Sequence, residues 1–242
     1  MLPLFNFISI MAGHSHWAQI KHKKAALDAK RGQIISKLIR AITIAAREGN
    51  NPETNYKLRS AIERAKEFQV PLENIERAIK KGESREDNLE EIIFEAYLED
   101  VQILIKAITD NKNRTLGDLR YLLNRFNGRL AEPGSVIWNF REKGVIVISK
   151  NDEGKVLEFA DLIEDYEEKN GDILLITNPS FLNELKNKLE SNKIEIKNSY
   201  LDFRPLNVLE NIDDNLKMKV KQLVEELLNL DDVEEVFTNL KD

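Results

Sequence analysis

Most residues that could bind or catalyse lie in one stretch near the N-terminus, GHSHWAQIKHKKAALDAKRG, residues 13–32. It holds all three histidines of the chain, one of its two tryptophans, and five lysines and arginines against a single acid, Asp28. Cationic side chains bind phosphates, and a flat ring stacks on an unpaired base. The stretch therefore predicts a nucleic-acid contact. Its candidate residues are His14, His16, Trp17, Lys21, His22, Lys23, Lys24, Lys30 and Arg31.

Two other interpretations of this stretch remain open. Trp17 could anchor the segment against the helices that follow, with the lysines merely solvated. Alternatively, His14, His16 and His22 could form a three-nitrogen metal site. The surrounding lysines would repel a divalent cation, however, and neither an acidic second shell nor an H-E-x-x-H motif is present. We expect no metal and no cofactor.

Net charge divides the chain into two parts of opposite sign. Residues 12–82 contain fifteen lysines and arginines and seven acids, a net charge of +8, whereas residues 83–242 contain twenty-one and thirty-five, a net charge of −14. Solvated helix faces explain an acidic body well, but they explain a basic module less well. The division favours a protein that presents one face to a polyanion.

A second polar cluster, TDNKNRT, occupies residues 109–115. Its simplest role is to cap a helix, because Asp and Asn side chains accept the first free N–H groups of a helix. Capping does not explain Arg114, since a cation in the first turn opposes the helix dipole. We therefore expect Arg114 to meet an anion, and we add it to the candidate nucleic-acid-binding residues.

The elements that would position these residues begin with an amphipathic helix from Gln33 to near Gly49. Its apolar residues keep to one face, and Lys37 and Arg40 lie on the other side, where both are further candidates for binding nucleic acid. Continuing the helix backward would place Lys24 and Arg31 in the apolar stripe, which predicts a break near Gly32 and a separate arm upstream. Two more helices follow, one around residues 58–68 and one from Pro71 to Gly82.

The remainder of the chain alternates strands and helices. Segment 143–204 has the order βαββαβ, with a hairpin turned at Asn170-Gly171, which is the ferredoxin-like split unit. Strands are expected at 92–98, 101–109, 135–140, 145–149, 165–168, 172–177, 193–201 and 233–238, and helices at 113–126, 154–163, 180–190 and 214–228.

These elements predict an α+β fold in which an all-α N-terminal domain precedes two ferredoxin-like α/β domains. The first β segment lacks a strand, and the last strand of the chain supplies it. We therefore expect the third domain to be inserted into the second. The expected domains are 1–82 for the basic arm and helices, 83–142 plus 205–242 for the discontinuous domain, and 143–204 for the insert.

Four segments of the chain, in order, closely resemble the YebC/PmpR family. They are AGHSHWAQIKHKKAALDAKRGQIISKLIR from residue 12, TDNKNRT, GSVIWNF followed by KGVI in 134–146, and DDVEEVFTN in 231–239. The similarity runs from Met11 to the C-terminus. One departure is YLEDV at 97–101, where the family usually has the glycine-rich turn YGPGGV, so any ligand contact made by that turn is in doubt here.

The resemblance implies three domains and a non-enzymatic role in gene expression. Family members are described as DNA-binding transcriptional regulators, and others as ribosome-associated factors that help translation through stretches such as consecutive prolines; the family also includes a mitochondrial activator of translation. We expect a nucleic-acid-binding regulator that acts on ribosomal or transfer RNA or on DNA. The alternative is a protein-interaction scaffold. No P-loop, G-x-G-x-x-G or G-x-S-x-G motif indicates an enzyme.

Further expectations concern the setting of the protein. The apolar opening, MLPLFNFISI, carries no basic residue and is too short for a signal peptide or membrane span, so we interpret residues 1–10 as an upstream-start extension or loose tail, with a membrane anchor as the alternative. The chain has no cysteine, which fits a reducing cytoplasm. We expect a cytoplasmic monomer without a membrane partner.

Overall fold

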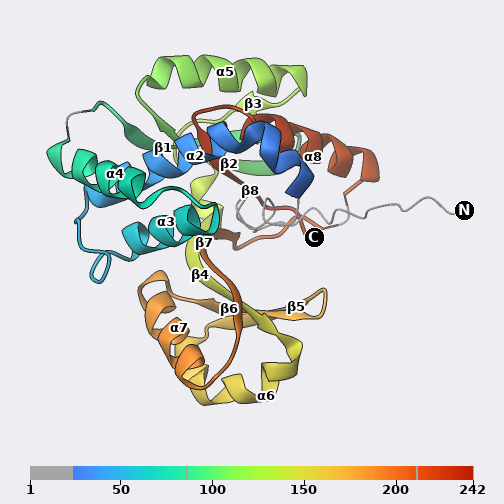
Figure 1. Cartoon of the computed structure of the whole chain (residues 1–242). Helices are drawn as coiled ribbons and strands as arrows, with labels where there is room; N and C mark the ends of the chain where they lie inside the picture. The colour runs from blue at the N-terminus through green and yellow to red at the C-terminus, as the bar shows by residue number, and fades with distance from the viewer. Residues whose placement is uncertain (1–23, 86, 211, 242) are drawn as a thin grey trace, which may run out of the picture.

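The computed structural model describes residues 24–85, 87–210 and 212–241 (Figure 1). Within these ranges, three helices come first, and two four-stranded antiparallel sheets with their own helices follow. This confirms the expected mixed α and β class. None of the described helices is long and apolar enough to cross a membrane.

The N-terminal helices are α2 (Lys24–Ala46), α3 (Tyr56–Glu67) and α4 (Leu72–Ser84). Asn55 begins α3 by accepting a hydrogen bond from the N–H of Leu58 at 3.0 Å, and Pro71 precedes α4. The helices bury a shared apolar cluster that includes Leu38, Ile42 and Ile75. The clean 3.6-residue spacing of these apolar side chains explains why this part was predictable.

The predicted helix break near Gly32 is wrong, because α2 runs without interruption through this residue. Arg31 and Gly32 are exposed, whereas Ile34 is buried. A charged residue on the apolar stripe is costly only where the stripe is covered. The stretch from Lys24 to Arg31 is therefore helical rather than a separate arm, and residues 13–23 of that arm lie outside the described residues.

The first sheet has the strand order β3-β1-β2-β8. The C-terminal strand thus pairs with β2 across a long stretch of sequence, as predicted from the unpaired β segment. Helices α5 and α8 cover one face and bury Leu119 and Leu223 against Ala96 and Ile103. The bounds are β1 (Glu90–Leu98), β2 (Val101–Thr109), β3 (Arg129–Leu130), β8 (Val233–Thr238), α5 (Lys112–Arg125) and α8 (Asp214–Leu228).

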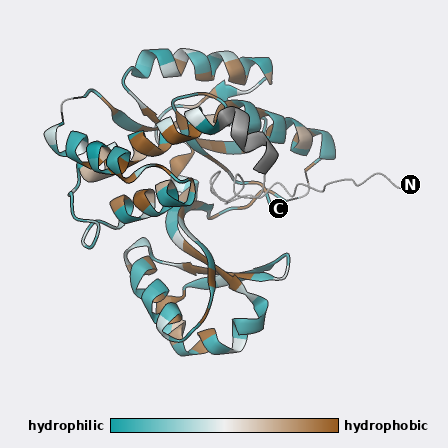
Figure 2. Ribbon diagram, in the orientation of Figure 1, coloured by the Kyte–Doolittle hydropathy of each residue, from teal (hydrophilic) through white to brown (hydrophobic). Residues whose placement is uncertain are grey.

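The opposite face of the first sheet meets α2 and α3, and this contact is rich in charge. A cavity of about 70 Å³ lies there, lined by side chains of α2, α3, β2 and β8. Arg64 of α3 pairs with Glu235 of β8 at 3.1 Å. Figure 2 shows hydrophobic residues on the strands and on the inward side of the helices, whereas the outer side of α5 is hydrophilic. Paired charges thus join the helical part to the sheet.

The second sheet has the order β5-β6-β4-β7, the arrangement of a split βαβ unit, with its first strand in the middle. Figure 1 shows it as a lower lobe that β4 and β7 connect to the rest. Asn170 and Gly171 turn the hairpin with positive φ angles of 51° and 81°, as the Asn-Gly pair predicts. The bounds are β4 (Phe140–Ser149), α6 (Glu153–Val156), β5 (Asp165–Lys169), β6 (Asp172–Thr177), α7 (Leu182–Ser191) and β7 (Ile196–Pro205).

Two elements differ from the prediction. Of the strand expected at 135–140, residues 135–139 form a turn followed by a 3-10 helix, η1 (Ile137–Asn139), and only Phe140 belongs to a strand, as the first residue of β4. The Glu95 carboxylate accepts hydrogen bonds from the N–H groups of Gly134 at 2.6 Å and Ile137 at 2.9 Å, which curls the backbone. The helix expected at 154–163 is the short α6 followed by a 3-10 helix, η3 (Leu157–Leu162).

Candidate nucleic-acid interface

The residues predicted to bind nucleic acid fall into three groups in the structure. Lys24 and Lys30 lie within α2, and Arg31 is exposed on that helix. Lys37, Arg40 and Arg114 make contacts within the chain. The remaining residues lie outside the described part: His14, His16, Trp17, Lys21, His22 and Lys23.

Lys37 does not face solvent, which contradicts its assignment to the outer side of the helix. Its side chain is buried, and the ammonium donates hydrogen bonds to the backbone carbonyls of Leu228, at 2.9 Å, and Val233. Burial lowers the pKa of Lys37 to about 8. The face of α2 that packs against the sheet is therefore wider than the stripe of apolar residues, and Lys37 lies at the edge of that face. This ammonium is not available to a phosphate.

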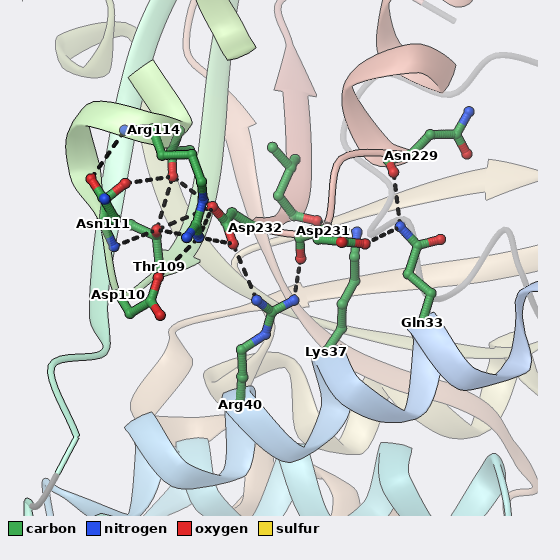
Figure 3. Close-up of polar contacts among 12 residues, drawn as sticks. Gln33, Lys37, Arg40, Thr109, Asp110, Asn111, Arg114, Asn229, Asp231 and Asp232 are labelled. Atoms are coloured by element: carbon green, nitrogen blue, oxygen red, sulfur yellow. Dashed lines mark hydrogen bonds and ion pairs between the residues drawn. The ribbon is translucent and has the colours of Figure 1, made fainter. Parts of the chain in front are cut away.

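Arg40 also turns toward the C-terminal part of the chain (Figure 3). Its guanidinium lies 3.2 Å from the Asp232 carboxylate and donates to the backbone carbonyl of Asp231. Nearer the start of α2, Gln33 donates to the carbonyl of Asn229 and to the Asp231 carboxylate, both at 2.8 Å. Three side chains on one face of α2 thus bind the segment between α8 and β8.

The anion expected opposite Arg114 is Asp232 of the same chain. The guanidinium donates to both carboxylate oxygens, at 3.0 and 2.7 Å, and also pairs with Asp110 at 2.9 Å. The capping role predicted for the TDNKNRT cluster is confirmed for Asn111, which accepts from the N–H of Arg114 at 3.1 Å. Arg114 therefore has a partner that does not require nucleic acid.

Asp232 is the centre of this arrangement, which we call the Asp232 cluster: Gln33, Lys37, Arg40, Thr109, Arg114, Thr115, Asp231 and Asp232. Besides the two arginines, its carboxylate accepts from the hydroxyls of Thr109 at 3.1 Å and Thr115 at 2.7 Å. Burial alone would raise the pKa of Asp232, but the hydrogen bonds from Arg114, Thr115 and Thr109 hold it below its usual value. The carboxylate is thus stabilised as an anion in the fold.

An open depression of about 550 Å³ lies beside the Asp232 cluster. Its charged lining has one acid more than bases, with Arg40 and Arg114 against Asp118, Asp231 and Asp232. Within the described ranges, no group of three or more His, Asp or Glu side chains could hold a metal ion. The geometry joins α2 to α5 and β8.

Sequence reasoning did not identify the Asp232 cluster. Two signals were present: a cation in the first turn of α5 without a local partner, and a lysine within reach of the apolar stripe of α2. Neither identifies its partner, since Arg114 and Asp232 are 118 residues apart.

Comparison with known proteins gives one consistent answer. A family model described as the TACO1/YebC protein N-terminal domain matches residues 15–85, and one described as the TACO1/YebC second and third domain matches residues 89–240. A relative from Thermotoga maritima named "Probable transcriptional regulatory protein" is 44% identical over 241 residues, covering 96% of this chain and 94% of the relative. A relative of the same name from Aquifex aeolicus is 41% identical over 239 residues, covering 96% of each chain.

A solved structure agrees with the sequence comparisons. The crystal structure of a conserved hypothetical protein from Aquifex aeolicus superposes with a TM-score of 0.80 at 40% identity, and covers 94% of this chain and 97% of that one. The relatives are named as regulators of transcription and not as enzymes. The family matches span both the helical part and the two sheets, and the chain therefore belongs to the TACO1/YebC family.

Proposed function

We propose that this protein is a non-enzymatic regulator of gene expression that binds nucleic acid through the segment from Gly13 to Arg31. The observation that carries the proposal is the concentration of positive charge. This segment has five lysines and arginines against Asp28, whereas residues 83–242 carry a net charge of −14. A polyanion is attracted to the first and repelled by the second.

The contacts within the fold sharpen this charge argument. Seven described cations of the helical part are already bound within the chain: Lys37 by backbone carbonyls and six others by carboxylates. These seven side chains are therefore left out of the proposed contact. The ion pairs are Arg40 with Asp232, Arg47 with Asp87, Lys57 with Glu48, Arg64 with Glu235, Arg77 with Glu73 and Lys81 with Asp87.

The Asp232 cluster contributes support rather than contact in this proposal. It fastens α2 to the sheet from Gln33 onward, and Lys24, Lys30 and Arg31 precede Gln33 in the same helix. The proposed site therefore comprises the basic residues up to Arg31, without Lys37, Arg40 and Arg114.

We assign ribosomal or transfer RNA as the ligand, in preference to duplex DNA. Trp17 and the three histidines are interleaved with lysines, and flat side chains stack on the bare bases of loops and ends. Bases in a regular duplex are already stacked. The relatives' names refer to transcription, so DNA is the ligand against which RNA has to be tested.

The decisive experiment removes the basic charge. We expect a variant with Lys21, Lys23, Lys24, Lys30 and Arg31 replaced by alanine to fold normally and lose binding to both RNA and DNA. The slope of log affinity against log salt should flatten by about 3.5 for a single strand and about 4.5 for a duplex. A matched control removes five exposed lysines that already pair with carboxylates: Lys150, Lys155, Lys188, Lys197 and Lys241.

A third variant, Trp17→Ala, separates the two ligands in the same assay. It should weaken binding to ribosomal RNA fragments by about 1–3 kcal/mol and leave binding to a DNA duplex unchanged. Equal effects on the two ligands would contradict the assignment of RNA. Undiminished binding by the five-alanine variant would overturn the whole proposal and favour a protein-interaction scaffold.

A further inference from the structure

The segment GSVIWNF, residues 134–140, has no role in the function proposed above, yet it presents a tryptophan to solvent. The side chain of Trp138 is 53% exposed. Its indole N–H donates to the backbone carbonyl of Ser135 at 2.8 Å, so the one polar group of the ring is already satisfied. The exposed surface of this ring is therefore apolar, and a hydrogen bond fixes its orientation.

The backbone beneath Trp138 is held from several sides. The buried Glu95 carboxylate accepts from the N–H groups of Gly134, Val136 and Ile137. The hydroxyl of Tyr97 donates to the same Ser135 carbonyl that binds the indole, at 2.8 Å. A ring on such a support loses little conformational freedom when a ligand covers it, which favours affinity.

Two arginines flank this support. The Arg129 guanidinium lies 4.9 Å from the centre of the Tyr97 ring. The Arg141 guanidinium donates to the carbonyls of Trp138 at 3.1 Å and Phe140 at 2.8 Å. Both arginines are exposed, and among the described carboxylates none forms an ion pair with either.

The local charge is opposite to that of the surrounding body. Residues 120–141 contain four arginines and one acid, Glu132, within a part of the chain whose net charge is −14. On the β1–β2 turn, Glu99 is paired with Lys219 at 3.1 Å. An exposed ring between unpaired cations is complementary to a base with its neighbouring phosphates.

We propose that Trp138, Arg129 and Arg141 form a second RNA contact, in which the indole stacks on an unpaired base and the two arginines bind flanking phosphates. The proposal rests on the nucleic-acid binding proposed above, and it assigns a site on the acidic body, apart from the N-terminal segment. The charge favours RNA over a protein partner. A protein partner is the competing occupant, because Leu206, whose N–H donates to the Asn139 carbonyl, is also exposed.

The chain offers a direct test, since Trp17 and Trp138 are its only tryptophans. The variant Trp17→Phe leaves Trp138 as the sole indole emitter. We expect single-stranded oligouridine to quench its fluorescence and a DNA duplex to leave it unchanged, because only unpaired bases can stack on the ring. Trp138→Ala in the otherwise natural chain should weaken oligouridine binding by about tenfold or more, and Trp138→Phe should retain most of it.

Charge variants test the arginines separately. Arg129→Ala and Arg141→Ala should each reduce the salt slope of oligouridine binding by about 0.7. Arg77→Ala, which removes an exposed arginine paired with Glu73, is the matched control and should change nothing. Thermal unfolding of each variant checks folding, and because Trp138 is half exposed we expect its substitutions to leave the midpoint unchanged.

The outcomes distinguish this proposal from the function on which it rests. If the five-alanine variant loses binding while Trp138 is not quenched and Trp138→Ala binds normally, the second contact is refuted and the proposed function stands. A protein partner then becomes the better occupant. If the natural chain binds neither oligouridine nor ribosomal RNA, both proposals fall.

Discussion

Replacing Asp232 by alanine should lower the free energy of unfolding by about 3 kcal/mol. The Asp232 side chain is only 7% exposed. Its carboxylate lies 2.7 Å from the Arg114 guanidinium and 3.2 Å from that of Arg40, and it accepts from Thr115 at 2.7 Å. Alanine removes this shared acceptor and weakens the attachment of α2 and α5 to the segment that joins α8 to β8, although Arg40 keeps the Asp231 carbonyl and Arg114 keeps Asp110.

The magnitude follows from the surroundings of each donor. Removing one partner of a buried ion pair usually costs about 3–5 kcal/mol. The lower end applies here because the Arg114 side chain is 48% exposed and can regain water. The hydroxyls of Thr109 and Thr115 also keep the 2.9 Å hydrogen bond between them. Arg40, with a side chain only 22% exposed, bears most of the loss.

Urea unfolding followed by circular dichroism measures the effect. The neighbouring Asp231→Ala is the matched control, because Asp231 is exposed and its carboxylate accepts from Gln33; its loss should be below about 1 kcal/mol. Since the pKa of Asp232 is held below its ordinary value, its charge contributes stability above about pH 4 that is lost as pH falls through the folded pKa. The difference in free energy of unfolding between wild type and Asp232→Ala should therefore decrease in acid. Equal stability of the two alanine variants at pH 7 would refute the reasoning.

Two further predictions test the packing and the buried charges. Gly82→Ala should destabilise the helical part by about 1–3 kcal/mol, because the added Cβ would lie 2.3 Å from the Thr43 carbonyl oxygen. Gly117→Ala should instead stabilise α5 by about 0.5–1 kcal/mol, because no atom lies within 4 Å of the added Cβ. Thermal unfolding of the two variants measures both effects. Burial raises the pKa of Glu234 from 4.5 to about 7, so the folded state binds more protons in that window and stability falls as pH rises through it. Glu234→Gln cannot ionise and should not lose this stability. The free energy of unfolding of Glu234→Gln minus that of wild type, measured in urea, should therefore increase by about 3 kcal/mol from pH 4.5 to pH 7. A difference that stays the same across this pH range would contradict the prediction.

Local pattern was sufficient for most of the fold. The helix predicted at 214–228 and the strand at 233–238 have those bounds in the structure. The Asn170-Gly171 hairpin also formed as predicted, since two residues with positive φ need those types. In each case the residues that determine the element lie within it. The order of elements then limited the second sheet to the split βαβ arrangement.

Prediction failed where a distant partner determines the conformation. Segment 135–140 is apolar enough for a strand, but the Glu95 carboxylate some forty residues earlier binds its N–H groups. The break near Gly32 was inferred from charge on a stripe, and only the tertiary structure shows that this stripe is uncovered there.

The sequence by itself determined most of the elements, the fold class, the division of charge and the family resemblance, because each depends on residues that are close along the chain. Only the tertiary structure decided which cations are free. Lys37, Arg40 and Arg114 look like ligands for phosphate in the sequence, yet backbone carbonyls and Asp232 bind them in the fold. A charged side chain takes the partner that folding brings within about 3 Å, and separation along the chain gives no measure of that distance.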